Sequence, residues 1–269
     1  MTAIDRISCN FRRLDRFALA DTAIHRLDAR AKVVVTLAFV LTVVSFDRYA
    51  VSALLPLFIF PIVLAALGGL PTGYLVKNVA IAIPFALTIA LFNPIFDRQV
   101  AFELGSLPIS GGWISGASIV VRAVLTLSAA VVLVGVTGFP AVCGALERLG
   151  MPRLFAAQLQ FLYRYIFVLL EDGACSARAL SLRCGGRMPR PRTVASLLGL
   201  LLLRSWQRAE QVHLAMLARA YGGEFYGRKS GRFGRRELLF VFAWLAVFYL
   251  LRSHDVAAVL GSLVVQVRR

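Results

Sequence analysis

Hydrophobic residues gather in long runs over the first half of the chain, and one further run lies near its end. The five runs cover residues 32–46, 49–70, 76–92, 113–138 and 238–251. A helix of about 20 residues crosses the hydrocarbon core of a bilayer, and flanking Arg and Trp side chains let shorter helices suffice. Each run is therefore a candidate membrane span. Pro56, Pro61 and Pro84 fall inside runs and predict bent helices.

The tail from Val256 to Val267 is too short to be assigned as a sixth span, and an interfacial position is the alternative.

Between the fourth and fifth runs the pattern changes to helices with a polar face. Pro140 and Pro152 bracket a short helix, and a long helix follows over 153–183 until Gly185 and Gly186 stop it. After a turn rich in arginine and proline, a second long helix is expected over 193–220. A stretch this long and this periodic is not a loop.

The two long helices carry different patterns. In the first, Gln160, Arg164, Glu171 and Arg178 share one face at helical spacing. The second is wholly apolar from Val194 to Leu203 and then places a polar stripe along one side, formed by Arg204, Arg208, Gln211 and Arg219. Such a helix leaves an apolar environment for a surface where one face meets solvent or a partner.

The two helices are expected to form an antiparallel pair, joined by the short turn between them. Their basic ends, Arg183 and Arg219, then lie at opposite ends of the pair or cross in a V.

Composition identifies the class of protein. Hydrophobic residues make up 59% of the 269 and charged residues 16%, so the chain holds more apolar surface than a water-soluble domain of this length can bury. We predict an all-α polytopic membrane protein with about five (four to six) transmembrane helices and a cytoplasmic helical domain built on two long helices. The expected parts are a cytoplasmic N-terminal arm (1–31), spans 1–4 (32–138), a cytoplasmic or interfacial helical domain (139–236), and a last span with its tail (237–269).

Basic residues set the expected orientation. The stretch 148–236 holds 16 Lys and Arg residues, the first 32 residues hold 7, and the connection 93–112 holds one. The positive-inside rule places the N-terminus and residues 139–236 in the cytoplasm and the 93–112 loop outside. The net charge of +16 is then explained by anionic lipid, and no nucleic-acid partner is expected. Residues 1–31 lack the apolar core of a cleavable signal peptide, so the first run is a retained anchor in the plasma (inner) membrane.

Motifs for catalysis are missing from the sequence. There is no glycine-rich phosphate loop, no nucleophile with a base, and no carboxylate pair at useful spacing. The three histidines are scattered, and the four cysteines share no metal-like spacing and are expected to be reduced; these residues are His25, His213, His254, Cys9, Cys143, Cys175 and Cys184. We expect a protein that is not an enzyme and binds neither a metal nor a cofactor.

Two polar features have competing interpretations. Arg122 is the one ionisable residue deep in a predicted span, where it marks a transport path or simply reaches the interface. In the arm before the first span, Asp28 is expected to cap the helix. The functional alternative makes His25, Asp28 and Arg30 a brace between the membrane helices and the cytoplasmic ones.

Arg183 and Arg219 stand out among the arginines because each lies between small or compact residues just before glycine. Leu182 and Cys184 flank the first, and Ala218 and Ala220 flank the second. This setting permits close approach of another protein, and a guanidinium fork suits an acidic or carbonyl-lined groove. The competing interpretation is contact with lipid phosphates.

Several segments resemble the transmembrane coupling (T) component of energy-coupling factor transporters, in its cobalt or nickel permease variant (CbiQ-like). The matching segments are 25–32, 147–152, 163–165, 208–210 and 215–221, and the resemblance covers nearly the whole chain. In that family two Ala-Arg-Gly-like signatures end coupling helices that dock into two cytoplasmic ATPase subunits. Arg219 matches the second signature, with Ala220 in place of Gly. Arg183 is the match for the first, and Arg178, between two alanines, is its competitor.

The resemblance implies a non-enzymatic subunit that links two ATP-binding subunits to a separate membrane protein that captures the substrate, within a lipid bilayer. A self-contained secondary transporter is the alternative, and it would need polar groups near the bilayer midplane. A membrane-embedded enzyme ranks third.

Overall fold

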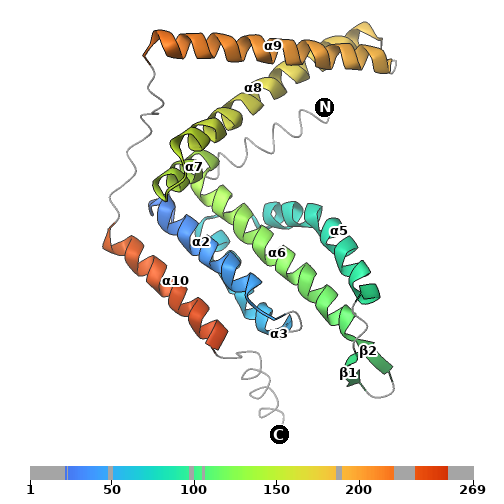
Figure 1. Cartoon of the computed structure of the whole chain (residues 1–269), viewed down its shortest axis with the longest axis vertical. Coiled ribbons are helices and arrows are strands. Elements are labelled where there is room, and N and C mark those ends of the chain that lie inside the picture. Colours follow the sequence, from blue (N-terminus) through green and yellow to red (C-terminus); the bar gives the residue numbers. More distant parts are fainter. Residues whose placement is uncertain are drawn as a thin grey trace. The chain divides into compact units, whose positions relative to one another are not determined.

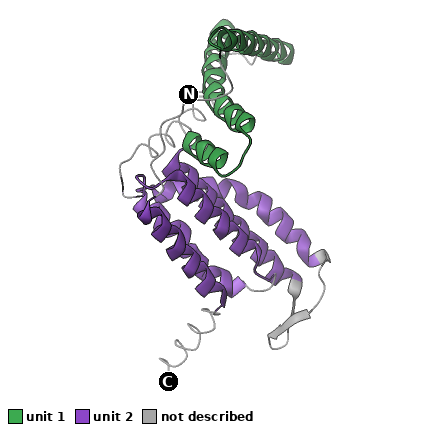
Figure 2. Cartoon of the chain, turned by 60° about the vertical axis from the view of Figure 1, so that its left-hand side comes forward, with its two compact units in different colours: residues 1–16, 139–229 green, residues 17–138, 230–269 purple. Residues whose placement is uncertain are grey.

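The structure is a computed structural model of the whole chain. It describes residues 22, 24–47, 51–96, 100–104, 107–185, 190–220 and 234–253. The basic residues of the arm before position 17, the glycine and proline turn at 186–189, His254 and the tail 256–267 fall outside these ranges. Two compact units make up the chain, one of residues 1–16 and 139–229 and the other of residues 17–138 and 230–269 (Figure 2).

Helices dominate both units (Figure 1). The larger unit contains α2 (Ala29–Val44), α3 (Val51–Leu54), the 3-10 helix η1 (Leu55–Phe58), α4 (Ile59–Leu67), α5 (Thr72–Phe96), strands β1 (Val100–Leu104) and β2 (Leu107–Ser110), α6 (Gly111–Thr137) and α10 (Arg235–Ser253). The smaller unit contains α7 (Phe139–Arg148), α8 (Arg153–Arg183) and α9 (Pro191–Ala218).

The capping role expected of Asp28 is confirmed. Its carboxylate accepts a hydrogen bond from the backbone N–H of Arg30 at 3.0 Å. Helix α2 begins at Ala29, the residue after Asp28. A side-chain oxygen at this position satisfies one of the free N–H groups of the first turn. The sequence between 25 and 32 therefore has a structural function at the start of α2.

An aromatic cluster forms the core of the larger unit. Phe39 of α2 stacks on Phe60 of α4 with ring centroids 4.5 Å apart, and Phe248 of α10 lies 5.5 Å from Phe39. Trp244 of α10 meets Phe60 edge to face at 4.9 Å. Such offset and edge-on pairs add to the gain from burial. Segments from both ends of the chain, α2 and α10, thus share one core.

Two connections differ from the expectation. The bent span expected over 49–70 is divided into α3, η1 and α4, because Pro56 lies at the start of the 3-10 helix and removes a backbone donor. The predicted external loop 93–112 instead contains the end of α5 and an antiparallel hairpin of β1 and β2, in which Leu104 pairs with Leu107. The prediction of bent spans at proline is confirmed at Pro56.

Arg122 has a structural function that the sequence did not reveal. From α6 its Nη2 donates to the backbone carbonyls of Phe46 at 2.8 Å and Asp47 at 2.6 Å, just beyond the end of α2. Arg252 of α10 lies over the ring of the same Phe46, 4.6 Å from its centroid. Backbone carbonyls outside a helix need a hydrogen-bond donor where water does not reach them, and Arg122 donates to two of them.

Helices α5 and α6 approach closely through small residues. A Cβ added at Gly116 would lie 2.8 Å from the backbone oxygen of Ala90, so a side chain there would collide with the neighbouring helix. Near this point Asn93 donates to the hydroxyl of Ser115. Small residues of this kind let membrane helices pack backbone to backbone.

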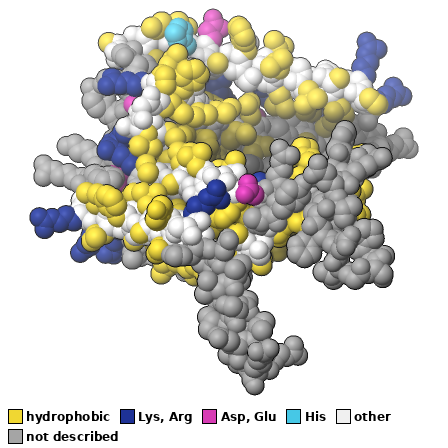
Figure 3. Space-filling model, turned by 60° about the horizontal axis from the view of Figure 1, so that its bottom comes forward, with side chains coloured by type: hydrophobic (Ala, Val, Ile, Leu, Met, Phe, Trp, Pro, Cys, Tyr) yellow, Lys and Arg dark blue, Asp and Glu magenta, His cyan; other side chains and the backbone are white. Residues whose placement is uncertain are grey.

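Three helices are long and apolar enough to cross a bilayer within the described ranges: Thr72–Pro94 in α5, Gly112–Thr137 in α6, and Arg153–Arg183, which is α8. Helix α2, with 16 residues, and the short apolar segment Val51–Leu67 fall below this length. The sequence pattern had assigned α8 to the cytoplasmic part. Among the described residues in Figure 3, many hydrophobic side chains are exposed, as expected of a chain that meets lipid.

Candidate functional site

The smaller unit begins with a tight helical corner. Helix α7 ends at Arg148, Gly150 takes a left-handed φ of +118°, and the N–H of Met151 returns to the carbonyl of Leu146 at 3.1 Å. Pro152 then precedes the first turn of α8, where a missing N–H costs nothing. The short helix and the long helix expected from Pro140 and Pro152 are therefore both present.

Side chains of α7 and α8 fix this corner. The rings of Phe139 and Tyr163 stack with centroids 4.8 Å apart, while Cys143 of α7 and Ala156 of α8 are both buried. Burial raises the pKa of the Cys143 thiol above its ordinary value, so at neutral pH it is a protonated, apolar filler. The corner anchors the N-terminal half of α8.

Helices α8 and α9 form an antiparallel pair. They approach closely where Gly173 faces Leu201, whose Cδ1 would lie 3.9 Å from a Cβ at the glycine. Nearby, Arg208 of α9 and Asp172 of α8 form an ion pair at 3.4 Å. Neither the glycine nor the acidic partner of Arg208 was singled out from the sequence, although both lie within the polar stretch.

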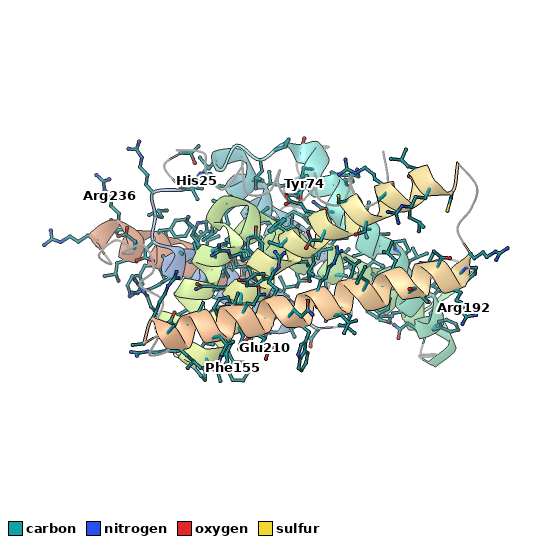
Figure 4. The ribbon with its side chains drawn as sticks, turned by 90° about the horizontal axis from the view of Figure 1, so that it is seen from above. His25, Tyr74, Phe155, Arg192, Glu210 and Arg236 are labelled. Atoms are coloured by element: carbon teal, nitrogen blue, oxygen red, sulfur yellow. The ribbon has the colours of Figure 1, made fainter. Side chains whose placement is uncertain are left out.

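The geometry decides between the two arrangements left open for the basic helix ends. Arg183 ends α8, and the next helix along the chain, α9, begins at Pro191. Helix α9 then runs for 28 residues, about 42 Å at 1.5 Å per residue, before it reaches Arg219. Figures 1 and 4 show α8 and α9 inclined to each other, with Arg192 near the start of α9 and Glu210 toward its other end. Arg183 and Arg219 therefore lie at opposite ends of the pair.

A groove of about 400 Å³ lies between the two helices, on the side of the ion pair toward the start of α8. Its walls are mainly apolar, and its polar groups come from both helices. The lining residues include Phe161, Leu162, Tyr165 and Val168 from α8 and Ser205, Arg208, Val212, His213 and Met216 from α9.

The end of α8 has a standard helix-terminating structure. Cys184 is the C-cap, and its N–H donates to the carbonyl of Leu180 at 2.9 Å. Gly185 follows with a left-handed φ of +55°, and its N–H donates to Leu182. Arg183 and Leu182 are both exposed at this end. A cation in the last turn is favoured by the helix dipole, which gives Arg183 a modest structural function as well.

The end of α9 repeats this structure with one difference. Arg219 is itself the C-cap, and Ala220 takes the left-handed position with φ +53°; among the described residues it is the one non-glycine with a positive φ. An L-residue pays about 1–2 kcal/mol in this conformation, and glycine is the usual occupant. The glycine that the resemblance expects at position 220 is thus the residue that the backbone favours there.

Measured from the left-handed residue, the two arginines are offset by one position. Arg219 directly precedes Ala220, whereas Cys184 separates Arg183 from Gly185. Arg178, the competing candidate, lies a turn and a half inside α8 and points its Nε to the carbonyl of Ala174 at 3.4 Å. Arg183 is therefore the arginine at the end of α8, and Arg178 lies in the interior of that helix.

Within the described ranges, the guanidinium groups of Arg183 and Arg219 make no hydrogen bond or ion pair, and both side chains are exposed. Two exposed cations at opposite ends of a helical pair can each be received by an acidic or carbonyl-lined groove of another protein. No group of three potential metal ligands is present in the described part of the chain.

The residues of the expected brace lie at the start of α2. His25 shares a hydrogen bond of 2.7 Å between its Nδ1 and the hydroxyl of Thr22, Asp28 caps the helix, and the Nε of Arg30 is buried without a hydrogen-bond partner. Lys32, one turn further, is also buried. These contacts explain the local fold, and the brace itself stays a prediction.

Comparison with known proteins places these features in a family. Residues 20–231 match the family model of CbiQ, described as cobalt transport protein. The chain is 27% identical over 227 residues to the energy-coupling factor transporter transmembrane protein EcfT of Thermosediminibacter oceani, covering 78% of this chain and 85% of that protein. It is 29% identical over 230 residues to the EcfT of Heliobacterium modesticaldum, with the same coverage.

A third relative is the cobalt transport protein CbiQ of Salmonella typhimurium. It is 31% identical over 158 residues, which is 54% of this chain and 70% of that protein.

Proposed function

This chain belongs to the CbiQ family, a family of multi-pass membrane transport components that are not catalytic, and on that premise we propose that it is the coupling subunit of an ATP-driven importer of the energy-coupling factor type. Its partners would be two cytoplasmic ATP-binding subunits and a separate membrane subunit that captures the substrate. The relatives named for cobalt transport make cobalt or nickel the proposed cargo. The expectation of a protein that is not an enzyme agrees with the family.

One observation carries the proposal: two exposed arginines end two packed helices at opposite ends of the pair. Each of two ATP-binding subunits could receive one guanidinium, since about 42 Å of helix separates the start of α9 from Arg219. Closure of the ATPase pair on ATP would then displace both ends of the α8–α9 pair. A link of this kind needs a packed element that moves as a body between two states.

We assign Arg183 with Leu182 and Cys184 to one contact, and Arg219 with Ala218 and Ala220 to the other. The position of Arg183 in the last turn of α8 favours it over Arg178. The proposed orientation has the N-terminus and residues 139–236 on the cytoplasmic side of the inner membrane, on the charge asymmetry. In that orientation α8 and α9 are coupling helices, and α8 does not count as a span despite its length.

A self-contained secondary transporter fits less well. Arg122 is the cation inside a predicted span that would mark a substrate path. Its guanidinium instead donates to the backbone carbonyls of Phe46 and Asp47. Polar groups of the α5–α6 contact, such as Asn93 and Ser115, are engaged with each other.

The test is purification of the tagged chain from its native membrane, followed by identification of the proteins that accompany it. We expect two ATP-binding subunits, or two copies of one, and a second membrane protein. The chain alone should neither hydrolyse ATP nor bind cobalt or nickel in a calorimetric titration. Submicromolar metal binding by the chain alone, or uptake by the chain reconstituted without partners, would contradict the proposal.

A further inference from the structure

The groove of about 400 Å³ between α8 and α9 is lined at a regular spacing. Its wall on α8 runs from Gln158 to Leu169, and its wall on α9 runs from Ser205 to Met216. On each helix, lining residues lie three, four, seven and eleven positions after the first. This is the spacing of a seam that packs against another helix. Leu162 and Leu169 in the α8 wall are nevertheless 62% and 40% exposed, so the seam is left partly uncovered.

The first 16 residues of the chain carry the same spacing in their sequence. Their large apolar residues follow one another at steps of three, four and three: Ile4, Ile7, Phe11 and Leu14. On a helix with about 100° per residue these four would share an arc of about 80°. The arginines of the segment, at positions 6, 12, 13 and 16, would all lie across the axis from that arc. The pattern predicts an amphipathic helix with a narrow apolar seam.

The two seams match in length. Each wall of the groove is about 16 Å long at 1.5 Å per residue, and the seam from Ile4 to Leu14 would be about 15 Å long. Residues 1–16 also belong to the same compact unit as α8 and α9, whereas the larger unit begins at Phe17. The arm and the groove are therefore parts of one unit.

A bilayer surface is the other apolar partner that a basic amphipathic helix can meet. A helix that covers a broad apolar surface presents three to four apolar residues in every two turns, an arc of about 100° or more. The arm has two in every two turns, which is the narrower seam of helices that pack together. Its width favours the cleft between two helices over a lipid surface.

We propose that residues 4–14 dock as a helix in the groove between α8 and α9, with Ile4, Ile7, Phe11 and Leu14 against its walls. The arginines of the arm then face water, away from Arg208 in the α9 wall. The docked arm makes a third helix of the pair and covers apolar walls that two helices leave open. This inference goes beyond the coupling function and does not depend on it, because the arm and the groove both belong to this chain.

Disulfide formation tests the contact. The full-length chain, with its four native cysteines changed to serine, receives Val212→Cys in the α9 wall and one cysteine in the arm. Thiols couple only where the Cα atoms approach within about 7 Å. In nanodiscs under mild oxidation, Ile7→Cys or Phe11→Cys should couple to Val212→Cys at least about tenfold faster than Arg13→Cys does. Arg13 is the matched control, because it lies near Phe11 in sequence but on the opposite side of the predicted helix.

Access to the groove is a second measurement. Val212→Cys should react with a water-soluble maleimide at least about tenfold faster when the seam is broken by Ile7→Ser and Phe11→Ser, because two apolar side chains then lose their burial. The control pair Arg6→Ser and Arg13→Ser should leave the rate unchanged. A thiol at Glu210→Cys, exposed on α9 outside the groove, should react equally in all three chains.

The proposal is overturned if neither Ile7→Cys nor Phe11→Cys couples faster than Arg13→Cys, or if breaking the seam does not change the reactivity at position 212. A fluorophore on Phe11→Cys that brominated acyl chains quench in the nanodisc would place the arm on lipid instead. Protection of Val212→Cys that appears only after partner subunits are added would assign the groove to another protein, which also contradicts the proposal. Each of these results leaves the proposed coupling at Arg183 and Arg219 intact.

Discussion

Arg208 of α9 and Asp172 of α8 form an ion pair, with 3.4 Å between Nη2 and Oδ2, beside the close approach of Gly173 and Leu201. Both side chains are more than a third exposed, so water screens the pair and its contribution to stability is at most about 1 kcal/mol. The pair joins the two long helices, so we expect it to favour one angle between them, and a small rotation at the contact would move their distant ends by much more.

The pair can be tested by charge reversal. Asp172→Arg should lower ATP-dependent uptake while changing the free energy of unfolding by no more than about 1 kcal/mol, since the pair is partly solvated. Asp172→Arg combined with Arg208→Asp should restore uptake. Glu210→Arg, an equal charge change on an exposed residue of α9, serves as the control. An inactive double reversal, or an Asp172→Arg chain as active as the native one, would remove the ion pair from the account.

The left-handed residues after the two helices predict opposite effects of matched changes. Ala220→Gly should stabilise the last turn of α9 by about 1 kcal/mol, because Gly adopts φ +53° without strain. Gly185→Ala should destabilise the end of α8 by a similar amount, since φ there is +55°. Hydrogen exchange of the amides in each last turn measures both. Shifts of the same sign at the two ends would show that the left-handed conformations are not what determines stability there.

Arg122→Leu should destabilise the membrane helices by about 2–3 kcal/mol. The change leaves the carbonyls of Phe46 and Asp47 without their donor and removes a charged hydrogen-bond partner. Arg252→Leu, which removes the cation from the other side of Phe46, should cost only about 0.5–1 kcal/mol. Denaturation in detergent micelles measures both variants. If the two costs are equal, the backbone contacts of Arg122 are not the main source of its contribution.

Topology can be tested with single cysteines in a chain whose native cysteines are serine. An impermeant thiol reagent applied to intact cells should label Ser106→Cys and spare Ser230→Cys, on the charge asymmetry between residues 93–112 and 139–236. Labelling of Ser230→Cys alone would invert the topology. In the native chain, Cys175 is exposed and should react in opened vesicles, whereas the buried, protonated Cys143 should not.

The long helices of the coupling part could be predicted from sequence because their signals are local. Gly185 stops α8 through its own backbone freedom, and Pro152 marks the start of α8. Helix α9 begins at Pro191, two residues before the start expected at 193. Asp28 could be identified as a cap in the same way. Each of these residues acts within one turn of its own position.

Features that depend on distant residues were not predictable in this way. Nothing in the sequence near Arg122 indicates that its partners are the carbonyls of Phe46 and Asp47 at the end of another helix. The pairing of Asp172 with Arg208 likewise depends on how α8 crosses α9. The division of 49–70 into three helices was missed because hydropathy measures composition, while Pro56 acts on the backbone hydrogen bonds.

For α8, hydropathy and charge predict different positions relative to the membrane. Arg153–Arg183 is long and apolar enough to span a bilayer, yet it also carries a polar face with Arg164, Glu171 and Arg178. Charge counting places it in the cytoplasm, and length alone would place it in the membrane. An amphipathic helix at an interface satisfies both patterns.

The most direct test of the coupling account is the retention of the ATP-binding subunits by variants of the two helix ends. Arg183→Ala and Arg219→Ala should each weaken assembly at least about tenfold, since a guanidinium buried in a partner's groove is worth 2 kcal/mol or more and 1.4 kcal/mol is one decade. Each variant should keep the thermal stability of the chain, because both arginines are exposed. Arg178→Ala, from the shaft of α8, should assemble normally. Full retention of the ATP-binding subunits and native uptake in both Arg183→Ala and Arg219→Ala would contradict the account.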